Sequence, residues 1–354
     1  MRTDLYILSS AAVSPQESFE LKDRYENIRE YQGTKLTCIE PDYKNILDPK
    51  LIRRMSRVIR MGAATALQCM KSANRLEVDG IITGTAYGCL EDTITFLNRM
   101  VGNKEEMLTP TAFIQSTHNT IAAQIALLLK CNAYNNTFVQ KSFSFEAALT
   151  DAVLLSREME NCVILTGAVD ELTETSHAII SRFNKYRENV VSSKMCESPA
   201  AGTMAGEGAA FFLLSNQNHS GAIARLDGMS MLYDPGKIED RKYWLNTFLD
   251  ENDSRREDIG LILVGRNGDS SHDQLYPELE SVFSPLANCF TYKNFCGEYP
   301  TSTSFAMWMA TETIRTGTLP LYNQPFNLQD EKKKILLLSS DIHGHNSAFL
   351  LSSC

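Results

Sequence analysis

The sequence has no block of five or six basic residues, no C-x-x-C pair and no long apolar run without polar interruptions. Lys and Arg number 34 against 43 Asp and Glu, which gives a net charge of −9. Such a chain offers nothing that could follow a phosphate backbone, so we expect no nucleic acid among its ligands. With 43% hydrophobic and 22% charged residues, the composition is that of a globular protein and excludes a disordered or collagen-like chain.

The nine cysteines are scattered and odd in number, with no histidines at zinc spacing. They predict reduced thiols in a cytoplasmic protein, with neither a disulfide framework nor a metal site. Residues 107–129 form the longest uncharged stretch, but Pro110, Gln115 and His118 interrupt it, so we expect no membrane span. The apolar run at residues 5–8 is too short for a signal peptide and predicts a first β-strand.

Short apolar runs bounded by glycine alternate with longer amphipathic stretches, a pattern typical of an α/β protein. The apolar runs predict further strands at residues 80–83, 137–139, 162–165, 209–214, 261–264, 335–338 and 348–351. The amphipathic stretches predict helices at residues 55–73, 117–129, 146–159 and 304–316.

Part of this order occurs twice, which indicates an internal repeat. Residues 79–84, a strand flanked by glycines, have a counterpart in residues 259–265. We match the small-residue helix that follows the first of these strands, at 116–129, with the one at 301–316. A further strand closes each half.

Turn-forming residues dominate the stretch 215–221, which we take as the boundary between the repeats. The sequence therefore predicts an N-terminal half, residues 1–217, and a C-terminal half, residues 218–354. Because each half is built from the same strand and helix pattern, we expect the two to share one core.

Seven segments resemble, in order, motifs of the β-ketoacyl synthases of the thiolase superfamily. Among them, Gly206-Glu207-Gly208-Ala209-Ala210 resembles the family's Gly-Glu-Gly-Ala signature, and the segment that begins at Lys293 resembles its Lys-x-x-x-Gly-His region. The segments are 79–88, 113–119, 137–152, 165–171, 206–210, 293–304 and 341–346. The resemblance implies a thiolase-like α/β fold with five layers, αβαβα, made of two pseudo-repeated halves.

That family's catalysis needs a cysteine thiolate at a helix N-terminus and two histidines that polarise a malonyl thioester and stabilise the enolate formed on decarboxylation. The resemblance places Ser142 at the cysteine position, Gly265 at the first histidine position and Glu298 at the second. Serine lacks the thiolate, glycine cannot hydrogen-bond a carbonyl, and an ionised glutamate repels an enolate. We therefore regard the three as vestigial triad positions and expect no condensation by the usual route.

A thiolase-like chain without this triad resembles a chain-length factor, the non-catalytic partner of an active ketosynthase in a heterodimer. This resemblance implies a subunit of type II fatty-acid, polyketide or aryl-polyene biosynthesis that meets an acyl carrier protein through its partner and needs no cofactor. Many chain-length factors carry glutamine at the cysteine position, where this chain has Ser142.

Other interpretations stay open at the level of sequence. Ser142 could act in an acyltransferase or hydrolase on acyl carrier protein or CoA thioesters, with His343 or His345 as its base, or it could simply cap the following helix. His343, His345 and Glu298 could form an acid–base cluster, whereas Lys293 could pair with Glu298 as a structural ion pair. A third class is a homodimeric scaffold without an acyl ligand.

Overall fold

The computed structural model describes residues 1–354 except 21–26, 234–236, 275, 285, 323 and 326–333. The strands are β1 (Arg2–Val13), β2 (Gly80–Gly84), β3 (Tyr134–Phe138), β4 (Val163–Asp170), β5 (Gly208–Ser215), β6 (Ala224–Tyr233), β7 (Ile259–Val264), β8 (Asn288–Thr291), β9 (Thr318–Leu319), β10 (Gln324–Pro325), β11 (Lys334–Ser340) and β12 (His345–Ser352). The α-helices are α1 (Pro49–Ile52), α2 (Arg57–Ser72), α3 (Leu90–Gly102), α4 (Pro110–Gln115), α5 (Thr120–Leu129), α6 (Ser144–Glu158), α7 (Glu174–Ser181), α8 (Ile238–Glu251), α9 (Ser270–Asp273), α10 (Pro277–Ser281), α11 (Lys293–Cys296) and α12 (Thr303–Thr316). In these ranges no helix combines the length and the apolar character that crossing a bilayer requires.

One ten-stranded mixed sheet runs through the molecule in the order β3-β2-β4-β5-β1-β6-β12-β11-β7-β8. Its two halves repeat outward from the middle, so that β1 corresponds to β6, β2 to β7, β3 to β8, β4 to β11 and β5 to β12. The directions match too: β2 and β7 are parallel to both of their neighbours, whereas β5 and β12 are antiparallel to theirs. Antiparallel pairing of β1 with β6 joins the halves. The predicted pair of repeated halves is confirmed.

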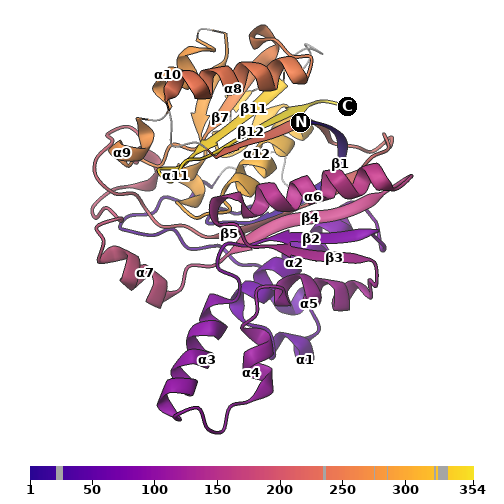
Figure 1. Ribbon diagram of the computed structural model, residues 1–354, viewed down its shortest axis with the longest axis vertical. Helices are drawn as coiled ribbons and strands as arrows, with labels where there is room; N and C mark the ends of the chain where they lie inside the picture. Colours follow the sequence, from indigo (N-terminus) through magenta and orange to yellow (C-terminus); the bar gives the residue numbers. More distant parts are fainter. Residues whose placement is uncertain (21–26, 234–236, 275, 285, 323, 326–333) are drawn as a thin grey trace.

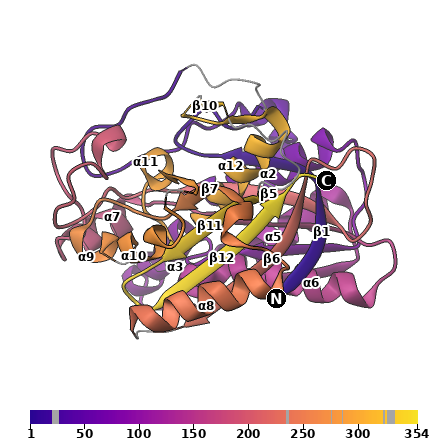
Figure 2. The same cartoon turned by 90° about the horizontal axis from the view of Figure 1, so that it is seen from above.

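Three hydrophobic clusters lie between five layers of secondary structure (Figures 1 and 2). Neighbouring side chains of a strand point to opposite faces of the sheet, so Ile82 belongs to the middle cluster and Ile81 to an outer one. In the second half Leu263 and Ile262 divide in the same way. The order of layers is therefore α2 with α5, the first half-sheet, α6 with α12, the second half-sheet, and α8 with α10. This is the predicted αβαβα fold.

The predicted strands and helices are present, but one predicted correspondence between the halves is wrong. Helix α12 precedes the strand β11 and lies in the middle layer, so its counterpart is α6, which precedes β4. Helix α5 instead packs on the outer face of the first half-sheet. The two helices were matched by their small residues, a feature shared by helices in different layers. Several elements were not predicted from the sequence, among them β6, β8, α3, α7 and α8.

The predicted boundary at residues 217 and 218 falls in the connection between β5 and β6. It stays a prediction, because β1 and β6 hold the halves in one continuous sheet.

The buried carboxylate of Glu207, just before β5, joins several segments of the N-terminal half. Glu207 is completely buried and accepts hydrogen bonds from both terminal nitrogens of Arg57, at 2.5 and 2.6 Å. It also accepts from the backbone N–H groups of Cys38 and Leu172. Arg57 opens α2 and contacts Glu40 as well. The Gly-Glu-Gly-Ala signature is thus a structural clamp that joins α2, the chain before it and the end of β4.

We expect Arg57→Met to destabilise the fold by about 3 kcal/mol, the lower end of the range for removing one partner of a buried ion pair, because it leaves the Glu207 carboxylate buried without its cation. Urea unfolding measures the change. Lys35→Met is the matched control, since it breaks the pair with Glu174, whose side chain is 87% exposed, and should have a much smaller effect. Equal effects of the two variants would contradict the role of Glu207.

A second buried carboxyl makes stability depend on pH. Glu146 lies in the middle layer, and burial raises its pKa to about 7. In the unfolded chain a glutamate ionises near pH 4.3, about its ordinary pKa. The folded protein therefore holds this proton more tightly, and the stability that is present below about pH 4.3 decreases as the pH rises to about 7.

Glu146→Gln should remove this decrease of stability with rising pH. The variant's free energy of unfolding, relative to that of the natural chain, should increase by up to about 1.4 kcal/mol per pH unit between these values and stay level above about pH 7. Urea unfolding over this range tests it, with Glu158→Gln, at the exposed end of the same helix, as the control for loss of one carboxylate. A difference that does not change with pH would show that Glu146 does not titrate in this window.

Candidate functional site

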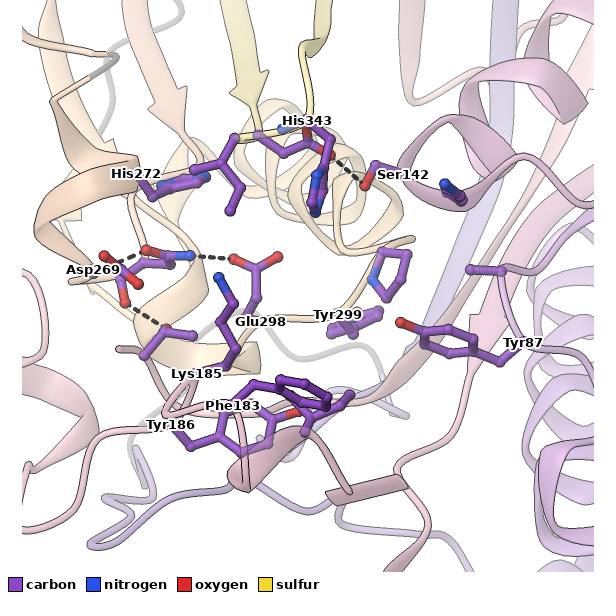
Figure 3. A pocket seen from close by; sticks show the side chains of 18 residues that line it. Tyr87, Ser142, Phe183, Lys185, Tyr186, Asp269, His272, Glu298, Tyr299 and His343 are labelled. Carbon is purple, nitrogen blue, oxygen red and sulfur yellow. Dashed lines mark hydrogen bonds between the residues drawn. The ribbon is translucent and has the colours of Figure 1, made fainter. Parts of the chain in front are cut away.

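A cavity of about 510 Å³ opens beyond the carboxyl ends of β2, β7 and β11 and is lined by both halves (Figure 3). Open α/β folds bind ligands at this end of their strands. The lining residues are Ala86, Tyr87, Lys141, Ser142, Ile180, Phe183, Lys185, Tyr186, Thr203, Asn267, Asp269, His272, Glu298, Tyr299, Pro300, Asp341, Ile342 and His343. The structure thus brings together Ser142, Glu298 and His343, three of the residues that the sequence singled out.

Ser142 lies in the turn that enters α6 and faces Asp341 of the loop between β11 and β12. Its hydroxyl donates to Asp341 Oδ2 at 2.7 Å. It makes no capping bond to α6, so the prediction that Ser142 caps this helix is wrong. The preceding residue, Lys141, has a φ of +53° and is in the left-handed region, which shapes the turn. Two segments 199 residues apart in sequence therefore meet at the cavity wall.

Asp341 lies between Ser142 and the imidazole of His345. His345 Nδ1 is 2.9 Å from Asp341 Oδ2, the oxygen that accepts from the serine. The order is serine, aspartate, histidine, whereas an activated serine needs the histidine beside it. Burial alone would raise the pKa of Asp341, but hydrogen bonds from the His345 backbone and from Ser142 outweigh it and hold that pKa below its ordinary value. A carboxylate so stabilised is a weak base for Ser142.

Glu298 projects into the middle of the cavity and is held from behind (Figure 3). Its Oε2 accepts from Lys293 Nζ at 2.7 Å and from Asn267 Nδ2 at 2.6 Å. The expected ion pair with Lys293 is therefore present. Burial alone would lower the pKa of Lys293, but the Glu298 carboxylate and the nearby tyrosines outweigh it and raise that pKa. Lys293 is 2% exposed, lies outside the cavity lining and remains a charged structural partner.

The predicted first histidine position, Gly265, directly follows β7. Gly265 does not line the cavity. A Cβ at this glycine would lie 2.8 Å from the Tyr276 hydroxyl and 2.9 Å from the Tyr292 hydroxyl, so these tyrosines fill the space of a side chain. Asn267 lines the cavity instead, beside Glu298. Both ends of its amide are in use, because Nδ2 donates to Glu298 and Oδ1 accepts from the Asp269 backbone N–H.

The two loop histidines do not share one environment. His343 lines the cavity with Glu298, whereas His345 does not line it and lies between the rings of Phe143 and Tyr233. The hypothetical cluster of both histidines with Glu298 is therefore not assembled.

A histidine that sequence reasoning missed also lines the cavity. His272 is 4% exposed, and its Nδ1 is 3.2 Å from Asp273 Oδ1. Asp273 in turn accepts from the backbone N–H groups of Asn267 and Gly268, which fixes the turn after β7. A His-Asp pair in a polar loop carries no periodic signal, so only the contact reveals its place. In the described part of the chain no group of three or more histidine, cysteine or acidic residues could hold a metal ion.

Changing Ser142 to cysteine tests the electrostatics of this wall. The N-terminus of α6 lowers the pKa of a thiol placed before it, but the Asp341 carboxylate in contact raises it. We expect the thiol introduced by Ser142→Cys to ionise at or above about pH 8.5, the ordinary value, and the double variant Ser142→Cys, Asp341→Asn to ionise at lower pH. Iodoacetamide alkylation of this position against pH, followed by peptide mass spectrometry, gives both values. A midpoint well below the ordinary value in the single variant would contradict the expectation.

Residues 34–196 match the family model described as the β-ketoacyl synthase N-terminal domain. No curated protein matches the sequence. The chain is similar along its whole length to a structure of the ishigamide ketosynthase/chain length factor, with a TM-score of 0.80 and 14% identity over 100% of both chains.

Two further solved structures are similar. One is the AntDE:AntF complex of a type II polyketide synthase acyl-carrier protein with its ketosynthase, with a TM-score of 0.72 and 16% identity over 100% of both chains. The other is the ketosynthase ApeO with its chain length factor ApeC from Xenorhabdus doucetiae, with a TM-score of 0.73 and 16% identity over 99% of this chain and 98% of that chain. Structural similarity at such low sequence identity establishes the fold alone. The expected resemblance is confirmed: residues 34–196 match the model of a β-ketoacyl synthase N-terminal domain, and the fold of the whole chain is similar to that of ketosynthase structures.

Proposed function

We propose that the chain is a non-condensing ketosynthase-like subunit, a chain-length factor that works in the cytoplasm beside an active ketosynthase in type II fatty-acid, polyketide or aryl-polyene biosynthesis. The observation that carries this proposal is the polarity of the cavity. Condensation needs a thiolate, and it needs hydrogen-bond donors aimed at the thioester carbonyl and at the enolate. At the positions that correspond to the triad this cavity offers no thiolate, and its serine hydroxyl and asparagine amide donate to carboxylates.

The side chains at those positions either accept hydrogen bonds or already donate them to a neighbouring residue. The Ser142 hydroxyl donates its proton to Asp341, and the Asn267 amide donates one of its two N–H groups to Glu298. Glu298 adds a carboxylate where an enolate would form, and like charges in contact repel each other. The malonyl carboxylate and the enolate that follows from it are both disfavoured here.

The order of Ser142, Asp341 and His345 also argues against the acyltransferase or hydrolase. A base must lie within hydrogen-bond reach of the proton that it removes. Asp341 occupies that place, and its lowered pKa makes it a weak base. The imidazole of His345 contacts the aspartate and no atom of the serine side chain.

An exposed apolar surface supports a protein partner. Helices α3 and α4 project from the layered body in Figure 1, and none of their residues is buried. Val101, Met107, Phe113 and Ile114, on these helices and the connection between them, are between 57% and 92% exposed. Apolar side chains gathered in this way mark interaction sites. Among the similar structures, ApeO is bound to its chain length factor, which supports a ketosynthase as the partner.

Co-expression with a ketosynthase from the same organism tests the proposal. We expect a stable one-to-one heterodimer by size exclusion with light scattering, and Phe113→Asp should weaken it at least tenfold because it charges the apolar surface. Tyr243→Asp is the matched control, since Tyr243 is 74% exposed on α8, in the outer layer of the other half.

Two results would contradict the proposal. One is a chain that forms only homodimers and captures no ketosynthase, which would favour the scaffold. The other is an acyl adduct on Ser142, formed with acyl carrier protein or acyl-CoA and absent from Ser142→Ala, which would favour the acyltransferase.

A further inference from the structure

The cavity presents two hydrogen-bond acceptors that the described residues do not saturate. Glu298 gives its Oε2 to Lys293 and Asn267, whereas its Oε1 has no partner among those residues. The Glu298 side chain is 30% exposed and points into the open space in Figure 3. His272 Nε2, in the same wall, has no partner in the described part of the chain either.

The hydrogen bonds of Asp273 determine whether His272 Nε2 is a donor or an acceptor. Asp273 already accepts two backbone N–H groups, so the proton shared with His272 is carried by the imidazole Nδ1. With its proton on Nδ1, the imidazole presents Nε2 as an acceptor. The wall around Glu298 is therefore rich in acceptors.

Four aromatic side chains form another part of the cavity wall. Tyr87, Phe183, Tyr186 and Tyr299 line it, and Figure 3 shows their rings grouped below and beside Glu298. A volume of about 510 Å³ lies in the range of small-molecule sites. Aromatic walls stack well on flat rings.

We propose that this cavity binds a ring-sized apolar group that carries a hydroxyl, of the phenol class, with Glu298 Oε1 accepting the hydroxyl proton. A ligand that carries a carboxylate is rejected by the same oxygen. The inference deepens the proposed function and rests on it in one respect, since it treats the cavity as a binding site without a covalent step.

Three small probes of similar shape separate the chemistry on the natural chain. They are 4-ethylphenol, which donates a proton, 4-ethylanisole, in which a methyl ether removes the donor, and 4-ethylbenzoate, which brings a carboxylate. Calorimetry should show 4-ethylphenol binding at least tenfold more tightly than 4-ethylanisole, about 1.4 kcal/mol, and 4-ethylbenzoate binding most weakly. Equal affinities, tighter binding of 4-ethylbenzoate, or no binding of any probe, as expected if the acceptors only hold water, would each overturn the proposal.

Glu298→Gln assigns the effect to one atom. Lys293 and Asn267 both donate to this side chain, so the glutamine oxygen must turn toward them and its NH₂ group toward the cavity. The preference for 4-ethylphenol should fall at least fivefold, and 4-ethylbenzoate should gain affinity. Glu278→Gln is the matched control, because Glu278 of α10 pairs with Lys242 outside the cavity lining, so its loss removes the carboxylate of an exposed ion pair and should leave the preference in place.

A Glu298→Gln preference equal to that of the natural chain would overturn the assignment. Because this variant leaves the buried Lys293 without its carboxylate, a thermal melt of the variant is measured as well. If the variant does not fold, the probe series on the natural chain still tests the proposal.

The result is independent of the heterodimer experiment. A chain that prefers 4-ethylphenol but captures no ketosynthase would retain this inference and lose the proposed function, and the reverse outcome would do the opposite.

Discussion

The pairing of β1 with β6 is the constraint on which the rest of the structure depends. It joins two half-sheets of identical topology edge to edge, so neither half completes its core alone. The inner faces of both halves pack against the same pair of helices, α6 and α12, which form one middle layer. Helix α12 is buried along nearly its whole length. Because the halves share this layer, the loops beyond β2, β7 and β11 are brought to one place, and the cavity is made there.

Close approach between the halves then sets the detail of the cavity. A Cβ on Gly206 would lie 2.0 Å from the Cys296 carbonyl oxygen, so the chain can pass only as glycine. Buried Asp170, at the end of β4, accepts hydrogen bonds from the backbone N–H of Tyr87 and from the Thr301 hydroxyl of the other half. Burial raises the pKa of Asp170 despite these bonds. The cavity floor is thus held by buried polar contacts that allow little rearrangement.

The side chains of the cavity differ from those that condensation needs. Condensation needs donors around a thiolate, whereas here Glu298 lies in the middle of the cavity and the Ser142 hydroxyl donates a hydrogen bond to Asp341. A buried Lys293 keeps the carboxylate in place from behind. The fold by itself therefore does not decide what this cavity does, because function depends on the side chains of the site.

Much of the fold could be predicted from the sequence, for a physical reason. Strands such as β2, β4 and β5 are buried on both faces, so they appear as short apolar runs between glycines. Strand β6 is half exposed, so it carries no apolar run that stands out. Helix α3 does have apolar residues at helical spacing, but none of its residues is buried. The ion pair between Lys293 and Glu298 was within reach, because five residues separate its members.

The sequence by itself determined the repeat, the α/β order and the absence of cysteine at the position before α6. Only the tertiary structure decided what surrounds that position. The bond between Ser142 and Asp341 spans 199 residues, and no spacing rule predicts it. Counting along the chain placed Gly265 in the site, but tyrosine hydroxyls fill that space and the turn presents Asn267 instead. Periodicity records which faces are buried, whereas a site is made by loops, whose directions follow from packing.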